Sequence, residues 1–264
     1  MNTRRLKKVW EKRSRKYKGQ IEGVLSKSFP RNINMYLDEW MFEQVKKEIL
    51  SKGKFNGKIL DLGCGYGRLS RHILKYFPES KTYGVDISKT YVDLYNKNLS
   101  PRGKAITANI KRLPYKNNFF DASIMVTTLM YMTGRNDQEQ VISEMIRVLK
   151  KGGVFIIIER NPIGQKIVTG AGLVEKIRGR KNKEIEAVGF YPSYISGLLN
   201  KKGGLIKNTY GIPIWTLTFP LTLLLSLIST NLGELFLRGI SFFESKLKLP
   251  LTLSLYISYT GNKK

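Results

Sequence analysis

The segment that most constrains the fold spans residues 59–68, with the sequence ILDLGCGYGR and a glycine at every second position from Gly63 to Gly67. The apolar residues before the glycines predict a buried strand, and the residues after them predict an amphipathic helix. Glycine permits a turn with positive φ and lets a ligand lie against bare backbone, while the helix presents N–H groups at its N-terminus. Residues 59–68 therefore predict a strand–loop–helix unit that binds a ligand.

Short apolar runs alternate with amphipathic helices from residue 58 onward, a pattern typical of βαβ units and a parallel sheet. The predicted strands are Lys58–Leu62, Lys81–Asp86, Lys104–Asn109, Asp121–Val126, Val154–Ile158, Leu205–Tyr210 and Leu251–Tyr259. The predicted helices are Asn34–Ser51, Arg68–Tyr76, a helix capped by Ser88 that runs to Leu99, and Asp137–Leu149, which Gly152 and Gly153 are expected to end.

A length of 264 residues suits one integrated domain better than two. Within it we expect three regions. Residues 1–52 form a basic N-terminal helical cap, residues 53–162 form the ligand-binding core, and residues 163–264 form a lid with a helical insertion and the final strands.

Two acidic residues beside the glycine loop indicate the kind of ligand. Asp61 stands two positions before Gly63, where it would repel a pyrophosphate but suits a ligand ammonium group. S-adenosylmethionine carries such an α-ammonium and a dinucleotide does not. Arg68 also occupies the place of the third glycine in the dinucleotide pattern. Asp86 ends the second predicted strand, where an acid can accept hydrogen bonds from both ribose hydroxyls.

Further motifs follow in a fixed order. They are the segment Ala108–Pro114 after the third strand, the Phe120-Asp121 pair that enters the fourth, and the sequence RVLKKGG at residues 147–153. With these motifs the chain resembles the class I S-adenosylmethionine-dependent methyltransferases that act on small molecules, over residues 10 to 160. The resemblance implies a Rossmann-like α/β fold. Its seven-stranded, mostly parallel sheet has an antiparallel last strand, helices on both faces and a helical insertion before that strand.

The resemblance also implies roles for individual residues. Asp61 would engage the cofactor amino group, the three glycines would line the methionine portion, and Asp86 would bind the ribose. The remaining cofactor residues expected on this basis are Tyr17, Gly63, Gly65, Gly67, Ile87, Asn109 and Ile110. The family usually has Asp where this chain has Asn109, and an amide oxygen accepts a hydrogen bond without charge assistance.

Methyl transfer from a sulfonium needs positioning above all, and a base only for a protonated acceptor. Ligands of open α/β sheets lie beyond the carboxyl ends of the strands, which points to Thr127, Tyr131 and Glu159. Thr127 is assigned to the cofactor, and Glu159 and Tyr131 are the candidate catalytic residues. Glu159 could act as general base or instead form a salt bridge with Arg160 or with a neighbouring helix. One cysteine and one histidine exclude a metal site built on these residue types.

The charge of +26, from 46 Lys+Arg and 20 Asp+Glu, favours anionic partners. Residues 208–233 carry no charge, but their apolar centre is too short to span a bilayer, which takes about 20 residues. Two amphipathic helices are predicted there, with one stripe formed by Leu221, Leu224, Leu225, Ile228, Leu232, Leu235 and Phe236. Residues 212–247 then either form a lid on the core or contact an anionic membrane surface, which the basic N-terminus and residues 176–183 would suit.

We therefore expect a methyltransferase that acts on a small hydrophobic or lipid-linked acceptor. It would be cytoplasmic, because no apolar run follows the basic N-terminus, and peripheral at the inner membrane face. Two alternatives stay open. One is an RNA (tRNA) methyltransferase, which the charge favours and which the absence of an Asn/Asp-Pro-Pro-aromatic motif after the fourth strand disfavours for base amino groups. The other is a non-catalytic protein that binds S-adenosylmethionine.

Overall fold

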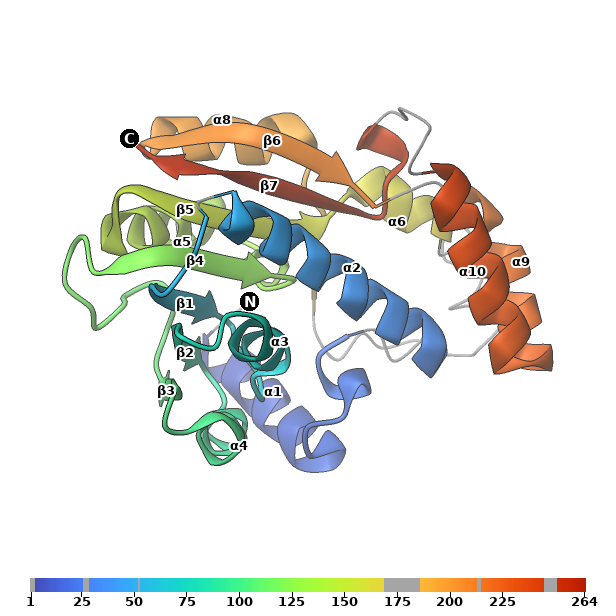
Figure 1. The fold of residues 1–264 in the computed structure, drawn as a ribbon, viewed down its shortest axis with the longest axis horizontal. Coiled ribbons are helices and arrows are strands. Elements are labelled where there is room, and N and C mark those ends of the chain that lie inside the picture. Colours follow the sequence, from blue (N-terminus) through green and yellow to red (C-terminus); the bar gives the residue numbers. More distant parts are fainter. Residues whose placement is uncertain (1–2, 26–28, 52, 169–185, 213–214, 245–250) are drawn as a thin grey trace.

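A computed structural model describes residues 3–25, 29–51, 53–168, 186–212, 215–244 and 251–264. Its centre is one seven-stranded sheet with the strand order β3-β2-β1-β4-β5-β7-β6 (Figure 1). Strands β1 to β5 pair in parallel, and β7 pairs antiparallel with both β5 and β6. The strands are β1 Lys58–Leu62, β2 Lys81–Asp86, β3 Gly103–Thr107, β4 Phe120–Val126, β5 Leu149–Arg160, β6 Gly204–Gly211 and β7 Tyr256–Lys263. The predicted fold class is confirmed.

Helices cover both faces of this sheet. They are α1 Thr3–Tyr17, α2 Arg31–Leu50, α3 Arg68–Tyr76, α4 Lys89–Leu99, α5 Arg135–Val148, α6 Pro162–Val168, α8 Pro192–Lys201, α9 Trp215–Ile228 and α10 Thr230–Glu244. Short 3-10 turns lie at η1 Ile21–Gly23, η2 Leu129–Tyr131 and η4 Leu251–Leu253.

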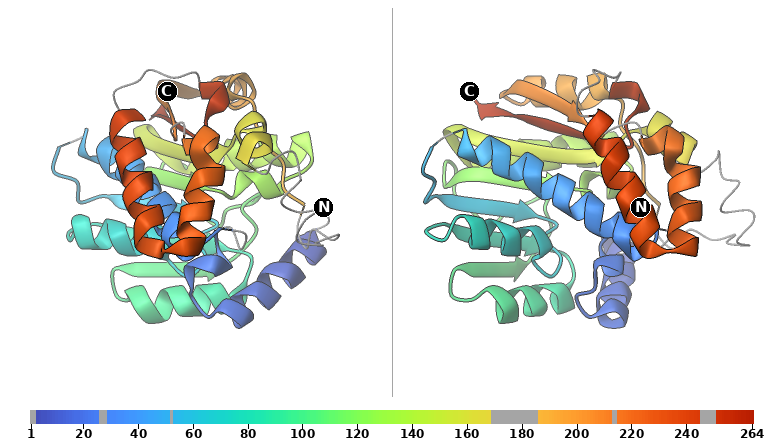
Figure 2. Two further views of the ribbon diagram at one scale, coloured as in Figure 1. Left: turned by 90° about the vertical axis from the view of Figure 1, so that its right-hand side faces the viewer. Right: turned by 45° about the vertical axis from the view of Figure 1, so that its right-hand side comes forward.

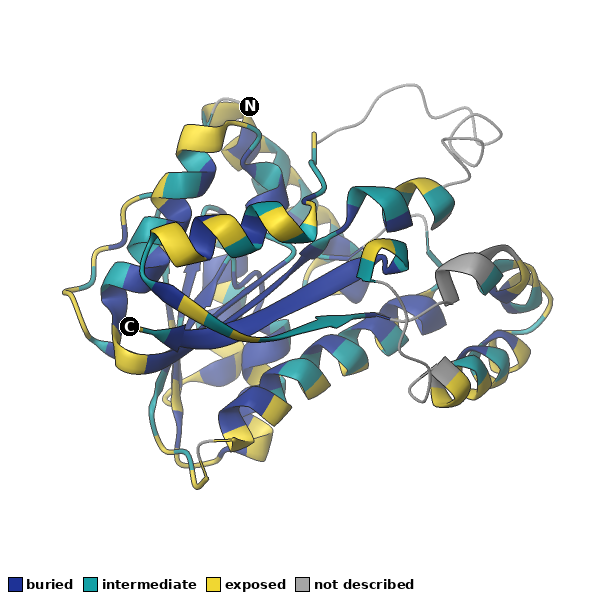
Figure 3. Ribbon diagram, turned by 90° about the horizontal axis from the view of Figure 1, so that it is seen from above, coloured by how far each residue is buried: buried dark blue, intermediate teal, exposed yellow. Residues whose placement is uncertain are grey.

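The two faces follow from the alternation of side chains along each strand. On β4, Ile124 joins the core that α2 and α3 cover, whereas its neighbour Met125 joins the core that α5 and α8 cover. Ile156 and Ile157 on β5 divide in the same way. Both faces of the central strands are therefore buried (Figure 3), as continuous apolar runs predict.

The strands and helices around the glycine loop lie where the sequence places them. Strands β1 and β2 and helix α3 have the predicted bounds. Helix α4 begins after Ser88, whose hydroxyl accepts the N–H of Tyr91. Strand β3 is shorter than expected, since it ends at Thr107 rather than at Asn109.

The prediction that Gly152 and Gly153 end a helix is wrong. Helix α5 ends at Val148, and β5 begins at once with Leu149. Phe120 pairs with Leu149, but Ala122 already pairs with Val154, so residues 150–153 bulge out of the ladder. Gly152 has a φ of 71°, a conformation that suits glycine and permits this bulge.

The last strand also starts later than predicted, at Tyr256 rather than at Leu251. The buried Asn161 side chain explains the difference. Its Nδ2 donates to the backbone oxygens of Leu251, Thr252 and Ser254, at 3.2, 2.6 and 3.0 Å. Because one amide nitrogen contacts all three backbone oxygens, the chain must turn around it. Residues 251–253 therefore form η4 instead of extending β7.

The helical insertion before the last strand is confirmed as α9 and α10, an antiparallel pair beside α2 (Figure 1). Residues 176–183, the second basic segment expected to suit an anionic surface, lie outside the described residues. In the part of the chain that is described, no helix has the length and apolar content needed to cross a membrane.

Candidate cofactor and acceptor site

A cleft opens to solvent where β1, β2 and β4 reach their carboxyl ends. The sheet supplies its floor, and α1 from the N-terminal region supplies one wall. Figure 2 shows that the side of the molecule to which the parallel strands point also carries α1 and the α9–α10 pair. This is the edge at which open α/β sheets bind ligands.

The glycine loop forms the backbone cradle of the cleft. Gly63 and Gly65 line it, with φ of 72° and 52°. A Cβ at Gly63 would collide with the Thr128 side chain, so the close approach requires glycine. Gly67 differs from the prediction, because its Cβ position faces Tyr95 and Leu99 in the core rather than the cleft. Gly67 lets α3 pack against α4 and is not among the residues that line the site.

Two buried carboxylates lie on either side of this loop. Asp86 accepts the N–H of Gly65 and the N–H of Ser88, both at 2.9 Å. Asp61 accepts the Ser70 hydroxyl at 2.7 Å. Burial raises the pKa of Asp61 to about 6, although the Ser70 hydroxyl and the Arg68 charge favour the carboxylate, and burial raises that of Asp86 to about 6, so further positive charge would stabilise both ionised forms. A ligand ammonium near Asp61 would supply such a charge.

The expected adenine side of the cleft is formed by Ile87, Asn109 and Ile110, which all line it. The Asn109 side chain has a structural partner as well, because its Oδ1 accepts the N–H of Lys111 at 3.0 Å. The amide thus closes a turn after β3, and the same oxygen is less available to a ligand than the sequence indicated.

The loop after β4 forms the end of the cleft away from the adenine side. Thr127 lines it with a φ of 51°, an uncommon conformation for a β-branched residue. Glu159 holds this loop. Its Oε1 accepts the N–H groups of Thr128 and Leu129 at 2.9 and 2.6 Å, and its Oε2 accepts that of Met130 at 3.3 Å.

Glu159 is fully buried and does not line the cleft. Burial raises the pKa of Glu159 to about 8. The three N–H donors act in the opposite direction, because they favour the carboxylate, but their effect is smaller. The alternative salt bridge is not formed either, since the Arg160 guanidinium contacts the Tyr256 hydroxyl. The geometry therefore favours a positioning role for Glu159, and a base at this residue stays a prediction. Tyr131, the other candidate, does line the cleft.

Helix α1 contributes residues that sequence reasoning missed. Leu6 and Trp10 line the cleft, and the Trp10 ring meets that of Tyr131 edge-on at 5.1 Å between centroids. The predicted cofactor residue Tyr17 lies outside the lining. It is two helical turns, about 10 Å, further along α1, where its Cβ packs against Gly23. The apolar positions of α1 were the available signal for Leu6 and Trp10.

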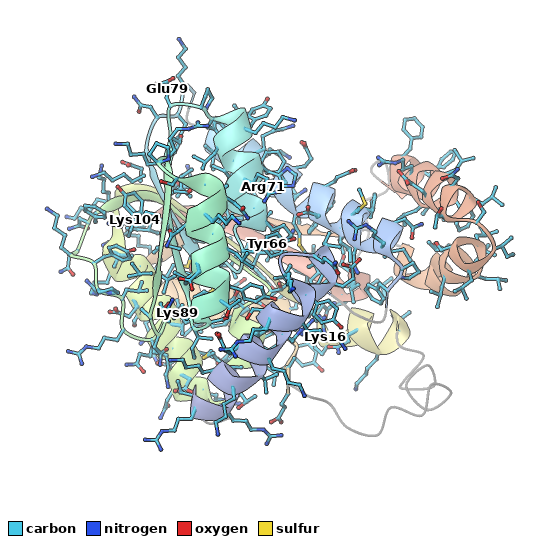
Figure 4. The ribbon with its side chains drawn as sticks, turned by 90° about the horizontal axis from the view of Figure 1, so that it is seen from below. Lys16, Tyr66, Arg71, Glu79, Lys89 and Lys104 are labelled. Atoms are coloured by element: carbon cyan, nitrogen blue, oxygen red, sulfur yellow. The ribbon has the colours of Figure 1, made fainter. Side chains whose placement is uncertain are left out.

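A short network holds α1 in place across the start of α4 (Figure 4, near Lys89). Glu11 accepts the Thr90 hydroxyl at 2.6 Å and the Ser88 hydroxyl at 2.9 Å. The Ser88 hydroxyl also lies 3.0 Å from that of Ser14. Because the Ser88 N–H donates to Asp86, Ser88 links α1 to the expected ribose-binding carboxylate.

Arg68 has a role that the glycine pattern did not reveal. It lines the cleft and pairs with Asp38 of α2, whose other oxygen lies 3.1 Å from the His72 ring. The Arg68 guanidinium, held by Asp38, thus reaches the glycine-loop side of the cleft, where its charge is opposite in sign to that of Asp61. The cradle, the two carboxylates and the cation together fit an amino acid head group with a nucleoside attached.

Comparisons with known proteins give the family that the core of the chain matches. Residues 60–157 match the family described as methyltransferase domain. The chain is 31% identical over 113 residues to a demethylmenaquinone methyltransferase of Thermotoga maritima, a match over 43% of this chain and 48% of that protein. It is 34% identical over 100 residues to a tRNA (carboxymethyluridine(34)-5-O)-methyltransferase of Arabidopsis thaliana, over 38% of this chain and 23% of the other. The match thus spans half or less of either relative.

Solved structures show the same fold. A geranyl diphosphate C-methyltransferase from Streptomyces coelicolor A3(2), in complex with Mg²⁺, geranyl diphosphate and S-adenosyl-L-homocysteine, superposes with a TM-score of 0.59 at 16% identity. The superposition covers 89% of this chain and 83% of the other. Residues 60–157 form a class I S-adenosylmethionine-dependent methyltransferase domain, and S-adenosylmethionine is the cofactor of this class.

Proposed function

We propose that the protein transfers a methyl group from S-adenosylmethionine to a small hydrophobic or lipid-linked acceptor. When bound, the cofactor supplies an activated methyl group. The observation that carries the acceptor class is the division of the cleft into two parts. Asp61, Asp86 and Arg68 gather on the glycine-loop side, whereas Leu6, Trp10 and Met132 give the other side an apolar wall.

The carboxylates of the described lining leave no evident base for the acceptor. Asp61 and Asp86 face the cofactor portion, and Asp137 pairs with Lys111 at 2.9 Å. Burial raises the pKa of Tyr131, so its hydroxyl stays protonated at neutral pH and serves as a donor. These groups suit an acceptor atom that is nucleophilic by itself, such as an electron-rich ring carbon, and a site that orients it and excludes water.

A transfer assay with tritium-labelled S-adenosylmethionine tests this proposal. Purified protein is incubated with a bacterial lipid extract, with a reduced isoprenoid quinone and with total tRNA, and organic and aqueous phases are counted separately. Label in the organic phase supports the proposal. Trp10→Ala should then raise the KM for the acceptor, because it removes the aromatic ring from the cleft wall. Trp10→Phe keeps an aromatic ring there and should leave the KM unchanged. Cofactor binding with no transfer to any of the three would instead favour the non-catalytic alternative.

A tRNA acceptor is the second candidate, since α1 is strongly basic and one relative is named for tRNA methylation. Label in the tRNA, with the lipid fraction blank, would establish it. Affinity for tRNA that falls steeply with salt and brings no transfer would show electrostatic attraction alone.

The expectation of a cytoplasmic protein at the inner membrane face belongs to the proposal of a lipid-linked acceptor. Fractionation of cells that produce the full chain tests this localisation.

A further inference from the structure

The α9–α10 pair exposes most of its large apolar side chains to solvent and buries polar ones between its helices. Small and polar residues occupy the contact between the two helices. Thr222 and Ser226 of α9 are buried, and a Cβ at Gly233 of α10 would collide with Ser226. The buried Asn32 of α2 donates to the Ser226 hydroxyl at 3.2 Å and to the backbone oxygen of Thr230 at 3.1 Å. The contact between the two helices is thus made by small and polar residues, and Asn32 ties it to α2.

Large apolar side chains point outward instead. Among the described residues, Leu235, Ile228 and Leu227 are the most exposed large hydrophobic side chains, at 71%, 69% and 68%. The large apolar side chains that are exposed among the described residues of the two helices are Leu221, Leu224, Leu227, Ile228, Leu232, Leu235, Phe242 and Phe243. We call these eight residues the hairpin patch. Figure 3 shows the exposed positions of both helices, set apart from the buried sheet.

The hairpin patch is a built feature of the protein and not a frayed end. Leu237 of α10 is fully buried in the core that α2 covers, and Leu223 and Ile240 pack against the same core. Arg238 also pairs with Glu39 of α2 at 3.1 Å. The core therefore holds the pair in one orientation with its apolar side outward, and exposed apolar side chains gathered on one element mark an interaction site.

Shape and charge indicate the partner. The hairpin projects from the edge of the molecule as a convex ridge (Figures 1 and 2), which can enter a fluid interface without a matching groove. On the same side of the molecule lies α1, whose exposed basic residues are Arg4, Arg5, Lys7, Lys8, Lys12, Arg15 and Lys16. Figure 4 places Lys16 at the end of α1 that lies toward the hairpin. An apolar ridge beside a polybasic helix is complementary to an anionic lipid surface.

We propose that the hairpin patch inserts into the interface of an anionic bilayer while α1 contacts the head groups. Helix α9 has 14 residues and is about 21 Å long, shorter than the roughly 30 Å apolar thickness of a bilayer, so the pair lies in the interface without crossing it. This orientation turns the cleft, which α1 partly covers, toward the membrane. The inference does not depend on methyl transfer, because lipid binding is measured directly.

Vesicle co-sedimentation tests the proposal on the full chain. The vesicles consist either of phosphatidylcholine alone or of phosphatidylcholine with phosphatidylglycerol. The test variant is Leu227→Asp/Leu235→Asp. Its matched control is Leu50→Asp/Leu205→Asp, in which two leucines of α2 and β6 that are 42% and 50% exposed receive the same charges. A third variant, Lys7→Gln/Lys8→Gln/Lys12→Gln, removes charge from α1. Circular dichroism melting shows that each variant folds.

We expect the wild type to bind the anionic vesicles more tightly than the neutral ones. The test variant should bind at least about 30-fold more weakly, because two inserted side chains are lost, and the control should stay within about twofold. The α1 variant should lose the preference for anionic lipid. The proposal is overturned if the wild type sediments with neither vesicle, or if the test variant binds like the wild type. A wild-type dimer that the same variant dissociates, without vesicle binding, would assign the patch to a second copy.

Discussion

The carboxylate of Glu11 accepts the Thr90 hydroxyl at 2.6 Å and so fastens the N-terminal helix to the start of α4, beside the cleft. Glu11→Gln should weaken this contact and lower the free energy of unfolding by about 1–2 kcal/mol, since a charged acceptor is lost. Affinity for S-adenosylmethionine should fall with it. Urea unfolding and calorimetric titration measure the two effects. Glu43→Gln, at an exposed ion pair with Lys46, should change neither.

The same contact predicts a pH dependence. Burial alone would raise the pKa of Glu11, but hydrogen bonds from Thr90, Ser88 and Arg15 outweigh it and lower the pKa to about 2. Because the folded-state pKa lies below the unfolded value, this stabilisation is complete above about pH 4.5 and is lost as pH falls toward 2. Acid unfolding of Glu11→Gln should therefore be less steep over that range than that of the wild type. Equal slopes would contradict the prediction.

Cofactor affinity should fall as the cleft carboxylates take up protons. Burial raises the pKa of Asp61 to about 6 and that of Asp86 to about 6, above the usual value near 4. Below pH 6 the cofactor ammonium loses its ionised partner, so the Kd for S-adenosylmethionine should rise by at most about tenfold per pH unit for each of the two groups that takes up a proton. Titration calorimetry between pH 5 and 8 measures this. Asp61→Asn should bind more weakly at pH 8 and show a flatter profile.

Acid should raise the stability of the ligand-free protein through Asp61 and Asp86, although it lowers cofactor affinity through the same two groups. Their folded-state pKa values exceed the unfolded ones, so the folded state binds protons more tightly between pH 6 and 4, and their contribution to stability rises as pH falls through that range. Saturating S-adenosylmethionine should remove this gain. Thermal melting with and without the cofactor provides the comparison.

Gly63→Ala should abolish cofactor binding by closing the cradle. The residue has a φ of 72°, and the new Cβ would press on Thr128, whose Cγ2 would lie at 2.5 Å. Gly53→Ala is the matched control, because Gly53 has a φ of 78° with no atom within 4 Å. The control should lose only about 1 kcal/mol of stability from backbone strain and should keep full cofactor affinity. Adding Thr128→Ala to Gly63→Ala should restore part of the binding.

Glu159→Gln separates positioning from base catalysis. The amide would turn an NH₂ group toward backbone donors at residues 128–130, which costs about 2 kcal/mol of stability and displaces the loop after β4. Stability and cofactor affinity should therefore fall together. A normal Kd and stability with a large loss of kcat would show that Glu159 is a base. Glu144→Gln, at a carboxylate that accepts the N–H of Leu113 at 2.7 Å away from the cleft, should leave cofactor affinity unchanged.

Local pattern was sufficient where chain neighbours supply the interactions. The strand before Gly63, helix α3 and the Ser88 cap depend on side-chain alternation, glycine conformation and one short-range hydrogen bond, and all three lie as predicted. The start of β7 could not be found this way, because the amide of Asn161 reaches it across 90 residues of sequence. The prediction that Gly152 and Gly153 end a helix failed for a related reason, because the bulge at residues 150–153 depends on pairing with strand β4.

The sequence by itself determined the parallel core, the glycine cradle and the two acids beside it, since each follows from residue type and spacing within one βαβ unit. Only the tertiary structure decided which face of α9 and α10 is buried, since a leucine stripe fits a core and a lipid surface equally well. It also decided that Trp10 rather than Tyr17 reaches the cleft and that Glu159 holds a loop. Those outcomes depend on packing between segments far apart in sequence, which a one-dimensional pattern does not record.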